Sequence, residues 1–183
     1  ALTGKHHGED EESWKLGYEI ISFMRDRMDK ATEEHELNFS VIATPAEGLS
    51  GKFVKKDREE FGAISGITNH NYYTNSFHIP VYYNMQAINK IRLEGPFHAL
   101  CNGGHITYIE LDGDPSQNLP AFEAVIRKMH DEGIGYGSVN HPVDRDPVCG
   151  FSGIITGDRC PHCGRLEGDL PFEKVCNCAK GDN

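Results

Sequence analysis

Residues 103–139 read GGHITYIELDGDPSQNLPAFEAVIRKMHDEGIGYGSV, and this stretch decides the fold class. Its first part, 103–111, is an apolar run with β-branched members opened by two glycines, which predicts a strand. Apolar side chains then recur at helical spacing from Leu119 to Glu132, and 135–139 favours one more strand. A strand, a helix and a strand in this order are typical of an α/β fold with short parallel strands.

The chain on the N-terminal side of that stretch continues the alternation. Apolar residues recur at three- and four-residue steps from Ser13 to about Glu36, with charged residues between them, which predicts a long amphipathic helix. The elements expected after it are a strand over 37–43, a helix from about Pro45 to Phe61, a long irregular loop over 62–75, a strand over 76–83 and a short helix or turn over 84–91.

Composition excludes several classes of function. The chain has 183 residues and a net charge of -10, from 28 acidic and 18 basic residues. General nucleic-acid or anionic-membrane surfaces need clustered Lys and Arg, so neither partner is expected. No apolar run approaches the roughly 20 residues that cross a bilayer, and the first residues form no hydrophobic signal core. We therefore expect a cytoplasmic protein, with one main domain and a small appendage.

The cysteines gather near the C-terminal end, where five of the six lie in the last 35 residues. In a reducing compartment such crowding favours a metal over disulfides. In the segment Cys160-Pro-His-Cys163-Gly164, two thiolates converge on one ion and the glycine permits the tight turn. A redox role is disfavoured, because no strand-to-helix context places Cys160 at a helix N-terminus. With Cys149, these residues predict a zinc site.

The fourth zinc ligand is left open by the sequence. Asp146, three residues before Cys149, competes for this position with His162, Cys176 and Cys178. The Cys-x-Cys spacing is unfavourable for double ligation, so at most one of the last two is expected to bind. Four protein ligands leave no open position for water, which makes a structural role the expected one. Our predicted set is Cys149, Cys160, Cys163 and Cys176, with Asp146, His162 and Cys178 as alternatives.

Three other segments could contact a ligand. At Thr44–Ser50 a strand runs into a helix N-terminus, which is a natural anion cradle but also an ordinary N-cap. Tyr72–His78 gathers aromatic and polar groups, as either a ligand-lining edge or a structural loop. Gly103 and Gly104 permit close backbone approach, and a lone histidine such as His105 is more often a hydrogen-bonded core residue.

Read together, these motifs resemble one enzyme family. The segments that carry the likeness are ALTGKHHG at 1–8, TPAEG at 44–48, YYTNSFH at 72–78, NGGH at 102–105 and the cysteine-rich end. In this order they closely resemble the C-terminal portion of class III anaerobic ribonucleoside-triphosphate reductases. The likeness runs from Ala1 to about Val175, and several motifs in register make it more specific than any single one.

The resemblance implies a fold and a function. Enzymes of that family are glycyl-radical proteins on a ten-stranded α/β barrel, and they reduce ribonucleoside triphosphates to deoxyribonucleotides. Residues 1–141 would form the second half-barrel and 142–183 a small zinc knuckle. The implied partners are a ribonucleoside triphosphate, the upstream half of the reductase or a second copy, and the radical-S-adenosylmethionine activase. Substrate phosphates would be met by Thr44, Pro45, Ala46, Glu47, Gly48, Leu49 and Ser50.

Three departures from the family pattern qualify this expectation. The thiyl-forming cysteine loop of the family lies upstream of the segment matching Ala1, and Cys101 does not correspond to it. The radical-glycine segment has no counterpart here, since Gly181 lacks its context. Asp146 stands where the family has the first cysteine of two Cys-x-x-Cys turns. We expect no glycyl radical in this chain and no turnover by it alone; the alternative is a non-catalytic, zinc-stabilised nucleotide-binding or subunit-interaction module.

Overall fold

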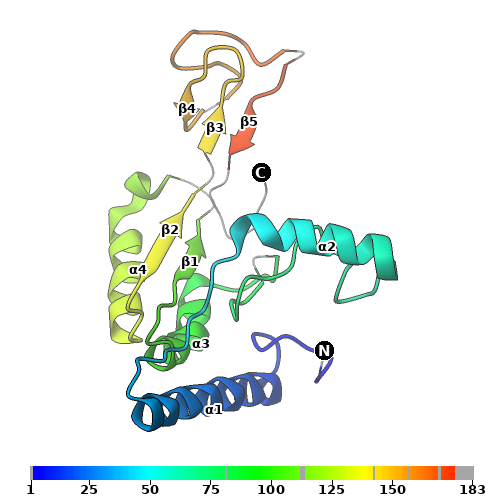
Figure 1. Ribbon diagram of the computed structural model, residues 1–183. Coiled ribbons are helices and arrows are strands. Elements are labelled where there is room, and N and C mark those ends of the chain that lie inside the picture. The colour runs from blue at the N-terminus through cyan, green and yellow to red at the C-terminus, as the bar shows by residue number, and fades with distance from the viewer. Residues whose placement is uncertain are drawn as a thin grey trace.

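The computed structural model describes residues 2–80, 82–111, 114–141, 143–155, 157–168 and 170–175. Figure 1 shows the helices gathered around two parallel strands, and a second, small sheet at the opposite end from α1. The elements are α1 (Glu11–His35), α2 (Glu47–Phe61), α3 (Ala87–Leu100), β1 (Thr107–Glu110), a 3-10 turn (Pro115–Asn118), α4 (Leu119–Asp131), β2 (Gly137–Asn140), β3 (Val143–Arg145), β4 (Ser152–Gly153) and β5 (Glu173–Val175).

The strand–helix–strand unit expected from 103–139 is present. β1 and β2 pair in parallel, from Thr107 opposite Gly137 to Glu110 opposite Asn140, and α4 connects them. The helix begins where the Asn118 side chain accepts the Ala121 N–H at 3.2 Å, and a proline follows in its first turn. The α/β class predicted from the sequence is therefore confirmed.

The long N-terminal helix is also confirmed, within two residues at its start. Asp10 caps α1 by accepting the Ser13 N–H at 3.0 Å, and two acidic residues fill the first turn, where the helix dipole favours them. The indole N–H of Trp14 donates to the Leu93 carbonyl at 2.9 Å and so fixes α1 against α3. The helix ends at His35, and the C-cap residue Glu36 adopts the left-handed conformation with φ of 52°.

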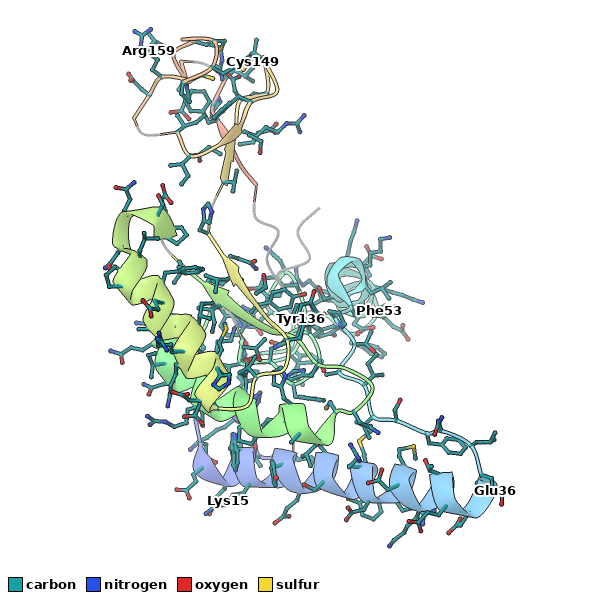
Figure 2. The ribbon with its side chains drawn as sticks, turned by 90° about the vertical axis from the view of Figure 1, so that its left-hand side faces the viewer. Lys15, Glu36, Phe53, Tyr136, Cys149 and Arg159 are labelled. Carbon is teal, nitrogen blue, oxygen red and sulfur yellow. The ribbon has the colours of Figure 1, made fainter. Side chains whose placement is uncertain are left out.

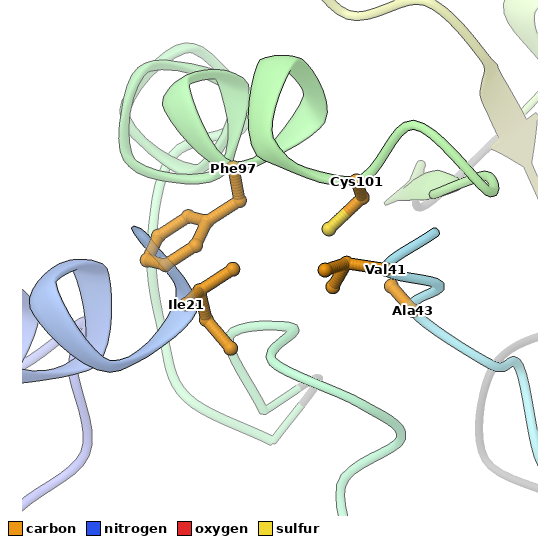
Figure 3. Close-up of a cluster of buried hydrophobic side chains, with 5 residues drawn as sticks. All are labelled: Ile21, Val41, Ala43, Phe97 and Cys101. Atoms are coloured by element: carbon orange, nitrogen blue, oxygen red, sulfur yellow. The ribbon is translucent and has the colours of Figure 1, made fainter. Parts of the chain in front are cut away.

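The two larger apolar clusters among the described residues pack the helices of the body together. Figure 3 shows the first, in which Ile21 of α1 and Phe97 of α3 meet Val41, Ala43 and Cys101. The second lies between α3, β1 and α4 and consists of Ile91, Ile109, Val125 and Met129. Because α3 contributes to both clusters, it is the central element of the body.

Two predicted strands are absent from the described residues. Within 37–43, only Ile42 forms a bridge, in parallel with Gly104. The Val41 N–H is taken by the side-chain oxygen of Asn102 at 3.0 Å, which replaces a ladder bond. At 76–80 and 82–83 no strand forms: Ser76 has a φ of 49°, and a carboxylate on α3 accepts the Ile79 N–H. Side-chain oxygens thus satisfy backbone groups that a sheet would otherwise pair.

The element expected as a short helix or turn over 84–91 is a longer helix that begins later. α3 begins at Ala87 and runs to Leu100, with Pro96 inside it. Gly95 also lies inside α3, where the helix passes close to the residue that follows α4. A Cβ added at Gly95 would lie 2.5 Å from the carbonyl oxygen of Glu132, just beyond α4.

This crossing predicts opposite effects for two glycine-to-alanine changes. Gly95→Ala should lower the free energy of unfolding by about 1–3 kcal/mol, because the methyl group forces α3 away from Glu132. Gly17→Ala, at a helical position of α1 with nothing within 4 Å of the added Cβ, should raise it by about 0.5–1 kcal/mol. Urea unfolding followed by circular dichroism measures both. Equal effects of the two variants would contradict the packing of α3 on α4.

The small sheet has the order β4-β3-β5 and is antiparallel. Asp144 lies opposite Gly153 on one side and Lys174 on the other. The domain boundary between 141 and 142 stays a prediction. None of the helices in the described part of the chain is both long and apolar enough to cross a membrane.

Candidate metal centre and anion site

Four side chains with metal-binding atoms converge in the small sheet region. Asp146, Cys149, Cys160 and Cys163 each offer one donor atom, and these atoms all lie within 4.8 Å of one another. Figure 2 marks the region through the labels of Cys149 and Arg159, at the end of the molecule away from α1. Asp146 and Cys160 are buried, whereas Cys163 lies at the surface.

Two turns of the same design supply these donors. The Gly150 N–H donates to the Asp146 carbonyl at 2.9 Å, and the Gly164 N–H donates to the Cys160 carbonyl at 2.9 Å. Both glycines adopt the left-handed backbone conformation, with φ of 72° and 74°, which a residue with a side chain rarely adopts. Asp146 therefore occupies in its turn the position that Cys160 occupies in the Cys-x-x-Cys-Gly turn.

Two of the distances between donor atoms match those expected around a tetrahedral zinc ion. Thiolates bound at about 2.3 Å lie about 3.8 Å apart across a tetrahedral angle, and a sulfur and a carboxylate oxygen about 3.6 Å apart. The sulfur atoms of Cys149 and Cys160 are 3.7 Å apart, and the Cys163 sulfur lies 3.4 Å from Oδ2 of Asp146. A disulfide would require about 2.05 Å, so the described cysteines are free thiols.

The carboxylate of Asp146 is held in place by Arg165. Nη2 and Nε of that arginine lie 2.9 and 3.0 Å from Oδ1, and the Val148 N–H also donates to Oδ1, at 2.9 Å. The hydrogen bonds from Arg165 hold the pKa of Asp146 well below its ordinary value, so the group is ionised. Oδ2 also accepts from Nε of Arg165, at 3.2 Å, and lies 3.4 Å from the Cys163 sulfur.

The thiols influence one another strongly. The Phe151 backbone lowers the pKa of Cys149, but burial and the neighbouring Cys163 and Cys160 outweigh this and raise that pKa to about 11. Burial raises the pKa of Cys160, but backbone N–H groups outweigh it and lower that pKa. Several thiolates in one place repel each other unless a cation joins them, which is the situation a metal ion relieves.

The structure brings some of the predicted metal ligands together and leaves others apart or undescribed. The structure brings Cys149, Cys160 and Cys163 together and adds Asp146 to them. His162 is exposed and its ring stacks on Phe151, outside this group. Cys176, which completed our predicted set, and Cys178 lie outside the described residues. Sequence reasoning missed Arg165, whose only signal was its place directly after the Cys-x-x-Cys-Gly turn.

The anion cradle expected at Thr44–Ser50 is the start of α2. Thr44, Pro45 and Ala46 precede the helix, whose first turn runs from Glu47 to Ser50. Because the N-cap residue is Ala46, it has no side-chain oxygen to accept the first N–H groups. A helix start without a cap leaves donors and the positive end of the dipole available to an anion.

The loop expected over 62–75 is irregular and lies against α2. Arg58 donates from Nε to the Thr68 carbonyl at 2.8 Å and from Nη2 to the His70 carbonyl. The Tyr73 hydroxyl donates to Asp57 at 2.7 Å, which raises the pKa of that tyrosine, and the Tyr73 N–H donates to the Ser50 carbonyl. Part of the Tyr72–His78 segment is thus beside the first turn of α2.

The glycine pair before β1 allows the close approach that was expected. A Cβ added at Gly103 would lie 2.7 Å from Oγ of Ser40. His105 is buried as predicted, but neither of its ring nitrogens has a hydrogen-bond partner among the described residues. His105 is therefore a core residue, as expected, but the expectation that its ring is hydrogen-bonded is wrong among the described residues.

Comparisons with known proteins agree on one family. The model of the protein family described as anaerobic ribonucleoside-triphosphate reductase matches residues 1–174. The reductase of enterobacteria phage T4 is 37% identical over 158 residues, which are 83% of this chain and 26% of the phage protein. That of Escherichia coli is 37% identical over 169 residues, 90% of this chain and 24% of the bacterial protein. The chain thus spans about a quarter of the length of these relatives.

Solved structures show the same fold. An anaerobic ribonucleotide reductase superposes with a TM-score of 0.69 at 24% identity, covering 93% of this chain and 25% of that chain. The Thermotoga maritima reductase with dATP in its specificity site has a TM-score of 0.68 at 22% identity, covering 93% and 26%.

Proposed function

Because the chain belongs to the anaerobic ribonucleoside-triphosphate reductase family, we propose that residues 1–183 form part of such a reductase. The reaction would be reduction of a ribonucleoside triphosphate to a deoxyribonucleotide by glycyl-radical chemistry. In this proposal the described residues form the second half of a ten-stranded barrel, contact the substrate phosphates and hold a structural zinc ion. The thiyl and glycyl radicals would come from other segments of the reductase.

The proposal that this chain contacts a nucleotide rests on the start of α2. Its first turn lacks a side-chain cap, so N–H groups at Glu47 and Gly48 can donate to phosphate oxygens without displacing an internal partner. Tyr73, held by Asp57 and by the Ser50 carbonyl, places a polar and aromatic segment beside this turn. Nucleotides are bound by the related Thermotoga maritima reductase, of which one structure contains dATP and CTP.

A charge placed at Gly48 tests this site. We expect Gly48→Asp to weaken binding of a ribonucleoside triphosphate about tenfold relative to Gly48→Asn, because only the carboxylate repels the phosphates. Both side chains fit, since nothing lies within 4 Å of a Cβ at this position. An acid in the first turn also favours the helix, so unfolding does not explain the loss. Calorimetric titration measures both affinities, and equal affinities would place the phosphates elsewhere.

For the metal centre, we propose that Asp146, Cys149, Cys160 and Cys163 hold zinc. The two matched turns and the 3.7 Å and 3.4 Å separations support this set over one completed by Cys176. A bound zinc ion would cross-link the two turns, which lie on either side of β4. Arg165 would orient the Asp146 carboxylate from outside the coordination shell, the role that second-shell partners have at zinc sites.

Exposed apolar side chains support a larger assembly. Leu49, Phe53 and Phe61 of α2 are 47%, 52% and 62% exposed, and Ile64 and Ile67 follow in the adjoining loop. A parallel pair such as β1 and β2 is normally covered on both faces and extended by further strands. We propose that the upstream half of the reductase, or a second copy of the chain, covers these surfaces.

A further inference from the structure

A second group of metal-binding side chains lies inside the body, on different elements from the cysteines. His78 comes from the segment before α3, Glu94 from α3 and His105 from the residues before β1. Each offers one donor atom within 4.8 Å of the others. The residues are 3%, 0% and 5% exposed, so all three are removed from solvent. Polar groups buried to this extent normally have partners.

The hydrogen bonds within this group are incomplete. Oε1 of Glu94 accepts the Ile79 N–H at 2.8 Å and lies 3.9 Å from Nζ of Lys90. Oε2 is 3.4 Å from Nδ1 of His78. Nε2 of His78 and both ring nitrogens of His105 have no hydrogen-bond partner among the described residues. Three buried imidazole nitrogens therefore remain to be accounted for.

The neighbouring His98 has a hydrogen-bond partner at each ring nitrogen. Its centroid is 4.2 Å from that of His105, yet both of its nitrogens are engaged. Nδ1 accepts the Gly135 N–H at 3.3 Å, so the neutral ring carries its proton on Nε2 and donates to Oγ1 of Thr107 at 2.8 Å. His98 is therefore not a candidate ligand, and it provides a matched control.

We propose that His78, Glu94 and His105 bind a divalent first-row transition-metal ion. Two imidazoles and one carboxylate are a donor set that proteins use for zinc and for iron(II). The two rings are 21° from parallel with centroids 5.2 Å apart, so one must rotate about χ2 to direct both lone pairs at one ion. That torsion is broad for histidine. The Ile79 N–H fixes Glu94 as a second-shell donor would.

A neighbouring cavity gives access to part of this site. His105 lines a cavity of about 320 Å³ together with His98, Asn102 and Tyr136. Three protein ligands leave positions open for water or a small ligand, and the cavity would bring an ion to His105, the one proposed ligand that lines it.

Cobalt(II) titration of the full chain, prepared free of metal, distinguishes the two centres. Thiolate ligands give cobalt an intense near-ultraviolet charge-transfer band, which an imidazole and carboxylate site lacks. We expect about two cobalt ions per chain for the wild type and about one for both Glu94→Gln and His105→Asn, with the thiolate band retained. His98→Gln should still bind about two. Glu94→Gln keeps an acceptor for the Ile79 N–H, so circular dichroism should show a folded protein.

Two results would overturn this proposal. The first is a wild-type chain that binds cobalt only with the thiolate band, at about one ion per chain. The second is full binding by folded Glu94→Gln or His105→Asn. If His105→Asn does not fold, the wild-type stoichiometry and Glu94→Gln still decide the question.

Discussion

Replacing Cys160 by Ser is expected to abolish zinc binding at the metal centre and to unfold the small sheet over 143–175. The region has few apolar contacts of its own: Ile155 and Cys160 are its buried apolar residues among those described, so the metal must supply most of its folding free energy. Structural zinc contributes on the order of 10 kcal/mol in small domains. Elemental analysis measures the zinc, and hydrogen exchange should show loss of protection in 143–175 while α1 and α3 stay protected.

Two further variants make this result specific to the metal centre. Asp146→Ala should also lose zinc, because it removes the oxygen donor, which is also the carboxylate that pairs with Arg165. His162→Ala lies in the same turn as Cys160 but is exposed, and it should keep zinc and protection. Zinc retained by Cys160→Ser, or lost by His162→Ala, would contradict the proposed ligand set.

Phe97→Ala is expected to lower the free energy of unfolding by about 3–5 kcal/mol. The Phe97 ring is 1% exposed and joins α3 to α1. It has edge-on contacts with Trp14 and Tyr18, at centroid distances of 5.9 and 5.8 Å, and a tilted contact with Phe77 at 5.4 Å. Its loss leaves a cavity that these aromatic rings cannot fill.

The matched control for this prediction is Phe23→Ala. Phe23 is also a phenylalanine on a helix, but 66% of it is exposed on α1, so its removal should change the free energy of unfolding by less than about 0.5 kcal/mol. Urea unfolding of both variants gives the comparison. Equal losses would show that the interface between α1 and α3 in Figure 3 is not the core of the body.

The long helices and the parallel pair β1 and β2 were predictable from the sequence, whereas the pairing of the other short segments was not. α1 and α4 follow from helical spacing, because each buries one face on the body. In the segments 37–43 and 76–80, side chains far along the chain, Asn102 and Glu94, each accept one backbone N–H that a strand could have paired, from Val41 and from Ile79. No local pattern reveals such a partner, so pairing of short strands depends on tertiary contacts.

The candidate metal site was likewise only partly predictable from the sequence. From spacing we predicted a site that includes Cys149, Cys160 and Cys163, and the structure brings these three side chains together. Spacing could not choose the fourth donor, since the choice of Asp146 depends on the matching turn and on Arg165. The group around Glu94 was not foreseen, because its members are 11 to 27 positions apart and share no motif.

The most direct test of the proposed function is calorimetric titration of the zinc-loaded chain with a ribonucleoside triphosphate and with the corresponding nucleoside. If the uncapped start of α2 binds phosphates, the triphosphate should bind at least about tenfold more tightly than the nucleoside, and added salt should weaken it. Equal affinity for the two compounds, or no heat from either, would contradict the claim that this part of the reductase contacts the substrate phosphates.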